Sequence, residues 1–250
     1  FTYKKLNSIL GFGMTKEELS RKDFLNNPEQ DLKFIYGQLD ATAFSKLNII
    51  LGSRYDYYTE YTPVISNKFA VGFSLNKKTS INSSIGTGFK IPDFRQRYFD
   101  FTNSTIGYTV LGRDVAFDRL ESMQNEGMIQ EIFIPFSELN SPLKSETSLN
   151  INLGVKYNLK TKLSFDVNLF NNKVQNLIEA QLVANKTSSL LPVFSYFNLN
   201  EVETKGIEFN TTYKPFSDWE IKIGYQLLYA YDTEVSRRFE TEEIYANDIN

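Results

Sequence analysis

Three arginines and two tyrosines in one stretch of the chain are the residues best suited to hold a ligand. They are Arg95, Arg97, Tyr98, Tyr108 and Arg113. An arginine guanidinium presents a rigid fork of donors that matches a carboxylate or a phosphate, and a tyrosine ring offers a flat surface with one polar end. This combination would suit a small molecule that is anionic and aromatic.

The composition excludes the commonest catalytic and metal-binding groups. The chain has no Cys and no His, so disulfides, Ser-His or Cys-His dyads and zinc sites built from Cys or His are excluded. Acidic clusters could hold calcium, but EF-hand spacing is absent and a solvated loop is the simpler interpretation. A net charge of -3 gives no indication of a nucleic-acid partner. We therefore expect no enzyme activity, no cofactor and no metal site.

The elements that must position these residues are amphipathic β-strands. Apolar residues alternate with polar or small ones in nine segments, and successive side chains of a strand point to opposite faces. The predicted strands are Thr2–Gly13, Leu32–Phe44, Leu47–Tyr57, Lys68–Asn76, Thr79–Phe89, Ser148–Asn158, Lys162–Phe170, Lys205–Tyr213 and Trp219–Tyr231. Each strand therefore has one apolar, aromatic-rich face and one polar face.

The connections between these strands alternate in length. The short ones are Ser45–Lys46, Lys77–Lys78, Leu159–Thr161 and Lys214–Asp218, and the long ones are Met14–Asp31, Tyr58–Asn67, Lys90–Thr147 and Asn171–Thr204. Short periplasmic turns and long extracellular loops are typical of outer-membrane barrels, whereas a soluble sandwich has no reason to alternate. The sequence predicts an all-β, antiparallel transmembrane β-barrel fragment. Single-chain bacterial barrels have an even strand number, so nine strands indicate part of a larger barrel.

The loop 90–147 leaves two questions open. A short helix is expected within Asp118–Phe133, interrupted at Gly127, and the loop could be a solvated lid or could contact a ligand. The arginine and tyrosine cluster also has an interpretation without a ligand. The aromatic residues could form the upper membrane-interface girdle, and the arginines could pair with Asp93, Asp100 and Asp114.

Five segments, in sequence order, resemble blocks of the TonB-dependent outer-membrane receptors. They are Ser84–Phe101 (SIGTGFKIPDFRQRYFDF), similar to the family's GTGFR-x-P block; Gly107–Gly112, similar to the stretch before Asn-Pro-x-Leu; Ser145–Tyr157, similar to E-x-S…G-x-x-Y; Phe170–Ile178, similar to F-x-N-x-x-x-x-L-I; and Val202–Phe209, similar to V-x-T-K-G-I-E. Five residues match the family motifs in a structural role: Gly86, Gly88, Phe89, Pro92 and Gly206.

The resemblance implies active transport across the bacterial outer membrane. It implies a barrel of about 22 strands, closed by an N-terminal plug and energised through the TonB complex, that imports a scarce nutrient. An iron–siderophore is the favoured substrate, with cobalamin or another chelate as further options, and haem is disfavoured because histidine is absent. The expected partners are the TonB complex through a plug, the chelate, outer-membrane lipid and a surface lipoprotein that could cap the loops.

The chain also departs from the family pattern. Residues 1–250 show neither a plug nor a TonB-contacting box, so we expect them to be a part of the barrel domain. The Asn-Pro-x-Leu block is replaced by Gly112–Val115, and Lys90 stands where the family has arginine. A passive porin or an adhesin barrel is the main alternative, and an outer-membrane enzyme or a soluble carbohydrate-binding module is a further one.

Overall fold

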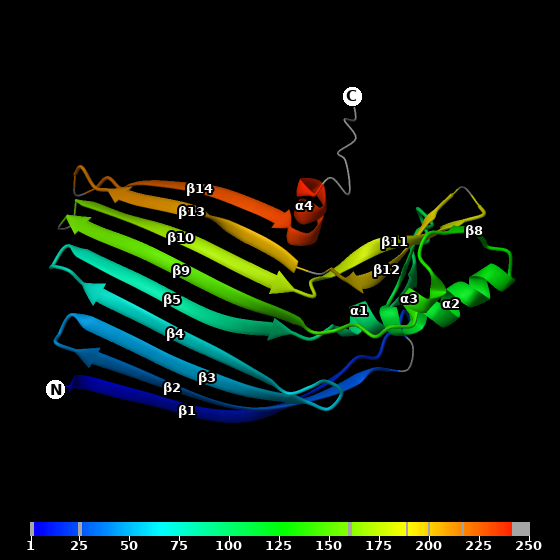
Figure 1. The fold of residues 1–250 in the computed structure, drawn as a ribbon, viewed down its shortest axis with the longest axis horizontal. Helices are drawn as coiled ribbons and strands as arrows, with labels where there is room; N and C mark the ends of the chain where they lie inside the picture. The colour runs from blue at the N-terminus through cyan, green and yellow to red at the C-terminus, as the bar shows by residue number, and fades with distance from the viewer. Residues whose placement is uncertain are drawn as a thin grey trace.

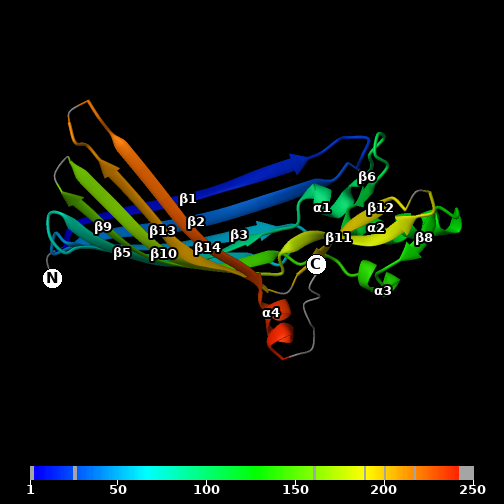
Figure 2. The same ribbon diagram turned by 90° about the horizontal axis from the view of Figure 1, so that it is seen from above.

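The computed structural model describes residues 3–24, 27–159, 162–188, 190–199, 201–216 and 218–241. Nine long strands form one antiparallel sheet in the order β1-β2-β3-β4-β5-β9-β10-β13-β14 (Figure 1). Their bounds are Tyr3–Glu18 (β1), Glu29–Ala43 (β2), Leu47–Tyr58 (β3), Val64–Ser74 (β4), Thr79–Lys90 (β5), Glu146–Leu159 (β9), Leu163–Gln175 (β10), Glu201–Tyr213 (β13) and Ile221–Asp232 (β14). The sheet is curved and open between β1 and β14 (Figure 2).

The register separates the two faces of this sheet. Directly paired residues point to the same side, so each row of pairs can be followed across the strands. One row joins Leu39, Leu51, Phe69, Ile85 and Ile151. A row on the opposite face, three residues nearer the short turns, joins Thr42, Asn48, Gly72, Asn82, Gly154, Asn168, Glu208 and Gln226. We call the apolar side the outer face and the polar side the inner face.

A second, smaller sheet stands at the end of the long strands opposite the short turns (Figure 1). Its five strands run in the order β6-β7-β12-β11-β8. Their bounds are Asp100–Thr102 (β6), Thr109–Leu111 (β7), Ile129–Ile132 (β8), Ile178–Lys186 (β11) and Pro192–Asn198 (β12). The helices α1 (Phe94–Tyr98), α2 (Arg113–Asn125) and α3 (Phe136–Leu139) accompany it. We call these five strands and three helices the loop unit.

The loop unit has its own hydrophobic core. Leu111, Leu120 and Val193 are fully buried, and Met123, Leu139, Val183 and Phe197 pack with them. The core combines residues from the β5–β9 connection with residues from the β10–β13 connection, and β12 pairs with β7 in parallel. Two segments far apart in the chain therefore fold together as one body. Beyond β14, the helix α4 (Thr233–Glu240) ends the described part of the chain.

The predicted antiparallel barrel fragment is confirmed by this fold. All nine predicted strands are present, although Thr2 lies outside the described residues. All four long loops are shorter than predicted. Two of them are shorter because β1 pairs with β2 up to Glu18 and β10 pairs with β13 up to Gln175. No helix among the described residues is long and apolar enough to cross a membrane.

One prediction for the long loops is confirmed in part and another was wrong. The expected helix within Asp118–Phe133 begins earlier, at Arg113, and ends at Asn125, just before Gly127, whose φ of 71° suits a residue without a side chain. After Gly127, the segment Ile129–Ile132 is the strand β8, because it pairs with β11. The segment Asn171–Thr204, expected to be a loop, holds β11 and β12, which the sequence analysis missed.

Candidate functional site

The helix α1, which follows the end of β5, carries three of the five predicted residues, Arg95, Arg97 and Tyr98. Asp93 Oδ1 accepts a hydrogen bond from the backbone N–H of Gln96 at 2.8 Å, and the Gln96 side-chain oxygen accepts one from the Asp93 N–H at 2.9 Å. This reciprocal capping box satisfies donors at the start of the helix, and Gln96 is buried. Asp93 therefore fixes the start of α1. The position of this helix determines where the side chains of Arg95 and Arg97 point.

Arg95 lines a hollow of about 430 Å³ at the loop end of the inner face. The inner-face residues Glu17, Tyr58 and Lys90 line the same hollow, as does Asp93. Arg95 is exposed and forms no ion pair with any residue that the structure describes. Lys90 pairs with Glu146 at 3.1 Å. We call this hollow the rim pocket, because it lies where the long strands meet the loop unit.

Arg97 points to a different place and joins three segments. Its guanidinium donates to Asp114 Oδ2 at 2.7 and 2.9 Å and to Glu60 in the β3–β4 loop. It also lies over the rings of Tyr98, at 4.4 Å, and Tyr61, at 5.5 Å. Burial disfavours the charged guanidinium and by itself would lower the pKa of Arg97. The Glu60 and Asp114 carboxylates and Tyr61 have the larger effect together, so the pKa of Arg97 is raised. These carboxylates already occupy the donors of Arg97.

The two predicted tyrosines belong to separate aromatic groups. Tyr98 packs against Arg97, and burial raises the pKa of its hydroxyl to about 12, so it stays protonated at neutral pH. Tyr108 meets Phe101 edge-on at 6.2 Å, and Phe101 stacks on Phe99 at 5.3 Å. Phe99 in turn contacts Phe24 of the β1–β2 connection at 5.1 Å. This second aromatic row ties the first long loop to the loop unit.

Arg113 lies inside the loop unit. Its Nε donates to the Ser141 carbonyl at 2.8 Å, its Nη1 donates to the Tyr196 carbonyl at 3.2 Å, and its Nη2 donates to the Glu138 carbonyl. The guanidinium also lies 4.1 Å from the centre of the Phe197 ring. Burial lowers the pKa of Arg113. Every guanidinium nitrogen is therefore engaged: two bind carbonyls of the same β5–β9 connection, and Nη1 joins it to β12 of the β10–β13 connection.

The structure thus brings Arg97 and Tyr98 together but leaves the other three predicted residues apart. Of the ion pairs considered from sequence, Arg97 with Asp114 is present, whereas Asp100 pairs with Arg119 at 3.2 Å. The sequence analysis missed Glu60 and Tyr61, because they are more than thirty residues away from Arg97 and no local pattern connects them. No group of three or more potential metal-ligating side chains occurs among the residues described.

The residues that match the family motifs occupy close-packed positions. Pro92 is fully buried and Phe89 meets the Tyr58 ring edge-on at 6.0 Å. Gly86 and Gly88 lie on the inner face of β5, and a Cβ at Gly88 would stand 2.9 Å from Ser148 Oγ. A Cβ at Gly206 would stand 2.1 Å from the Leu227 carbonyl oxygen. These contacts leave no room for a side chain at position 206.

We expect Gly206→Ala to destabilise the sheet by about 1–3 kcal/mol, since the added methyl group must displace backbone. The measurement is the denaturant midpoint of the folded protein in detergent, followed by the heat-dependent shift in its gel mobility. Gly72→Ala is the matched control, because a Cβ there meets nothing closer than 3.9 Å on the same inner face. An unchanged midpoint for Gly206→Ala would contradict the close approach.

The comparisons with known proteins agree with this architecture. A family model described as "TonB dependent receptor-like, beta-barrel" matches residues 3–249. No curated protein sequence matches the chain. Among solved structures, the siderophore receptor PirA from Pseudomonas aeruginosa is similar with a TM-score of 0.71 and 16% identity, over 91% of this chain and 40% of that chain.

Two further solved structures show the same fold. A mutant of the ferric enterobactin receptor PfeA from Pseudomonas aeruginosa has a TM-score of 0.62 and 15% identity, over 89% of this chain and 33% of that chain. The copper transporter OprC has a TM-score of 0.57 and 14% identity, over 82% of this chain and 30% of that chain. The chain therefore spans less than half the length of the proteins whose structures it matches.

Proposed function

Because the chain belongs to the TonB-dependent receptor β-barrel family, we propose that it forms part of the wall and the extracellular loops of an active-transport receptor. The family places it in the bacterial outer membrane, as the sequence predicts. We propose that residues 1–250 are one section of the barrel domain, with the outer face against lipid and the inner face toward the lumen. The loop 90–147 then lies outside the cell, as part of the loop unit.

The substrate that this chemistry favours is an iron–siderophore, or otherwise cobalamin or another chelate. The observation that carries this proposal is the rim pocket, where Arg95 and Lys90 offer cationic donors beside the Tyr58 ring. PirA and PfeA are a siderophore receptor and a ferric enterobactin receptor. OprC is a copper transporter, but this chain has no His or Cys and three Met, which does not favour a soft metal ion.

The five residues predicted from sequence would then differ in their contribution. Arg95 would bind the anionic chelate directly, and Arg97, Tyr98, Tyr108 and Arg113 would act by holding the loops above the rim pocket. The family is one of transport receptors, and we propose that this chain performs no covalent chemistry. Energy would come from the TonB complex through a plug domain, and a surface lipoprotein could cap the loops.

The test is uptake of radiolabelled ferric enterobactin and radiolabelled cobalamin by iron-starved cells. Cells that produce the complete receptor are compared with cells that lack it, each with and without TonB. Uptake of either chelate that needs both the receptor and TonB supports the proposal. Entry of small solutes that needs the receptor but not TonB would show a passive porin, and surface attachment without any uptake would show an adhesin.

We expect Arg95→Ala to weaken chelate binding by about 10- to 100-fold, because a hydrogen bond to a charged group contributes about 1.5–3 kcal/mol. The measurement is the Kd of the purified receptor for the chelate that the uptake assay identifies. Lys144→Ala is the control, since Lys144 is an extracellular cation that lines a separate hollow with Arg97 and Thr147. If Lys144→Ala weakens binding as much as Arg95→Ala does, the overall positive charge of the loops, and not the rim pocket, attracts the ligand.

A further inference from the structure

The outer face of the sheet carries a short row of small and polar residues within its apolar surface. Gly37 pairs with Ser53, and Ser53 pairs with Asn67. The Asn67 backbone N–H donates to Thr87 Oγ1 on the next strand at 3.0 Å. The row therefore crosses four adjacent strands, β2 to β5, at one level. The neighbouring row toward the short turns is apolar throughout, from Leu39 to Ile151.

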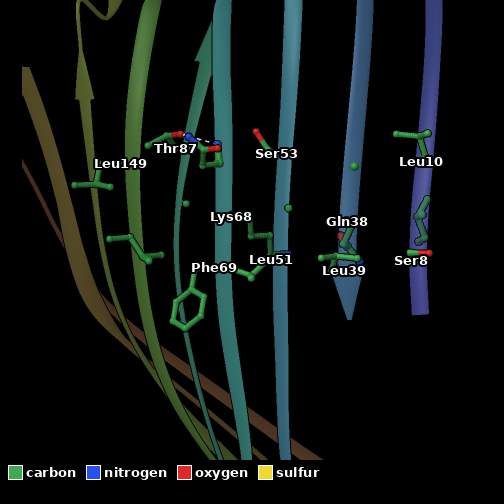
Figure 3. A pocket seen from close by; sticks show the side chains of 16 residues that line it. Ser8, Leu10, Gln38, Leu39, Leu51, Ser53, Lys68, Phe69, Thr87 and Leu149 are labelled. Carbon is green, nitrogen blue, oxygen red and sulfur yellow. Dashed lines mark hydrogen bonds between the residues drawn. The ribbon is translucent and has the colours of Figure 1, made fainter. Parts of the chain in front are cut away.

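A hollow of about 780 Å³ lies along this row. Its walls come from larger apolar side chains, which include Leu10, Leu39, Leu51, Phe69 and Leu149 (Figure 3). The hollow exists because small residues lie between large ones at this level, so the surface is recessed there. Ser8, Gln38 and Lys68 also line the hollow. Most of its surface is nevertheless apolar, so it fits a hydrocarbon chain.

The level of the hollow in the membrane follows from its neighbours on β3. Tyr55 and Tyr57 lie on the same face toward the loops, and Leu51, Ile49 and Leu47 lie toward the short turns. Tyrosines mark the membrane interface. Ser53 is two residues from Tyr55, about 7 Å along the strand, and the tilt of barrel strands shortens that depth further. The hollow therefore lies in the outer-leaflet half of the apolar band, just below the tyrosines.

The polar groups in the hollow lack partners in the part of the chain that the structure describes. Ser53 and Asn67 are exposed, and neither side chain forms a hydrogen bond with a described residue. Water does not reach this depth, and an unsatisfied polar group in hydrocarbon is costly. A plain acyl chain would fill the apolar walls but would leave the amide of Asn67 unpaired. An occupant that also carries hydrogen-bonding groups below its headgroup satisfies both requirements.

We propose that this hollow binds an acyl chain of an outer-leaflet lipid whose chains carry hydroxyl, ester or amide groups. The apolar part of the chain lies against Leu51 and Phe69, and an oxygen of the chain pairs with Asn67 and Ser53. A lipid is the occupant because the hollow is continuous with a face that contacts the acyl chains of the membrane on all sides. The proposal rests on the outer-membrane location and is independent of the transported nutrient.

The test is native mass spectrometry of the complete receptor, extracted from outer membranes in a mild detergent. Two variants alter the hollow differently. Asn67→Leu removes the amide, and Gly37→Leu fills the recess, where a Cβ has nothing closer than 3.9 Å. The control is Ser83→Leu, since Ser83 lies on the same face between Val71 and Leu153 but does not line the hollow. The gel-mobility shift on heating confirms that each variant is folded.

We expect the wild-type receptor to retain one lipid with hydroxylated or ester-bearing chains. In both hollow variants the fraction of receptor with bound lipid should fall at least five-fold, and in Ser83→Leu it should stay at the wild-type level. Equal lipid retention in all four proteins would overturn the proposal, as would an equal loss in the control. A receptor dimer that disappears in Asn67→Leu would show that a second copy covers the hollow. Chelate uptake, measured in parallel, separates this outcome from that of the transport proposal.

Discussion

Replacing Arg113 with methionine is expected to destabilise the loop unit by about 2–5 kcal/mol while the long sheet remains intact. Methionine keeps much of the volume of the side chain but offers no donor. The carbonyls of Glu138, Ser141 and Tyr196 would then lose the guanidinium that joins them. A buried acceptor left without its partner costs more than the hydrogen bond itself contributed.

Hydrogen exchange measured by mass spectrometry distinguishes this effect from global unfolding. Backbone amides of β7 and of β12 should lose protection together in Arg113→Met, because the side chain links the two loops. Amides of β9 and β10 should keep it. Arg113→Lys should restore little, since a single ammonium group cannot reach three carbonyls in different directions. Loss of protection in one loop alone would show that the loops are stable separately.

Leu120→Ala is expected to cost about 2–5 kcal/mol of the stability of the same unit, by a different route. Leu120 is fully buried on α2, among Leu111, Leu139 and Val193. Its truncation leaves a cavity that neighbouring side chains fill only in part. The arginine network is untouched by this change, so the two variants test separately the core and the hydrogen bonds of the loop unit.

The measurement for Leu120→Ala is again hydrogen exchange, now combined with protease sensitivity of the extracellular loops on intact cells. Leu51→Ala is the control, because Leu51 is half exposed on the outer face of β3. That control should leave the loops protected. Cleavage within α2 at the wild-type rate in Leu120→Ala would mean that the core contributes less than its burial indicates.

The long strands could be predicted because apolar and polar residues alternate along each of them. This alternation indicates which side chains lie on the apolar face of the sheet and which lie on the polar face. In β9, residues from Leu149 to Tyr157 alternate between an apolar outer face and a polar inner face. This two-residue alternation continues along most of the strand. Every second connection is also a short turn, so β3 pairs with β2, β5 with β4, β10 with β9 and β14 with β13. Four of the five family blocks include residues of these long strands, and Gly107–Gly112 lies in the loop unit.

The loop unit could not be predicted in the same way. Strands β6 and β7 have three residues each, which is too short for a period to be recognised. In β11, the register shifts between Leu182 and Ala184, so that Val183 and Ala184 are both buried and the alternation is broken. The burial of Arg113 depends on carbonyls from residues 25 to 83 positions away, and local sequence holds no signal for such contacts.

The parallel pairing of β7 with β12 has a consequence for immune recognition of the cell surface. Val193, Phe194 and Ser195 lie beside Thr109, Val110 and Leu111, although the two long strands β9 and β10 separate them in the chain. Four of these six residues are fully buried, so the pairing brings exposed residues of two loops together around them. We therefore expect epitopes on the loop unit to be discontinuous. A synthetic peptide copied from either loop would present half of each such surface, so antibodies that block the receptor should be raised against the folded protein.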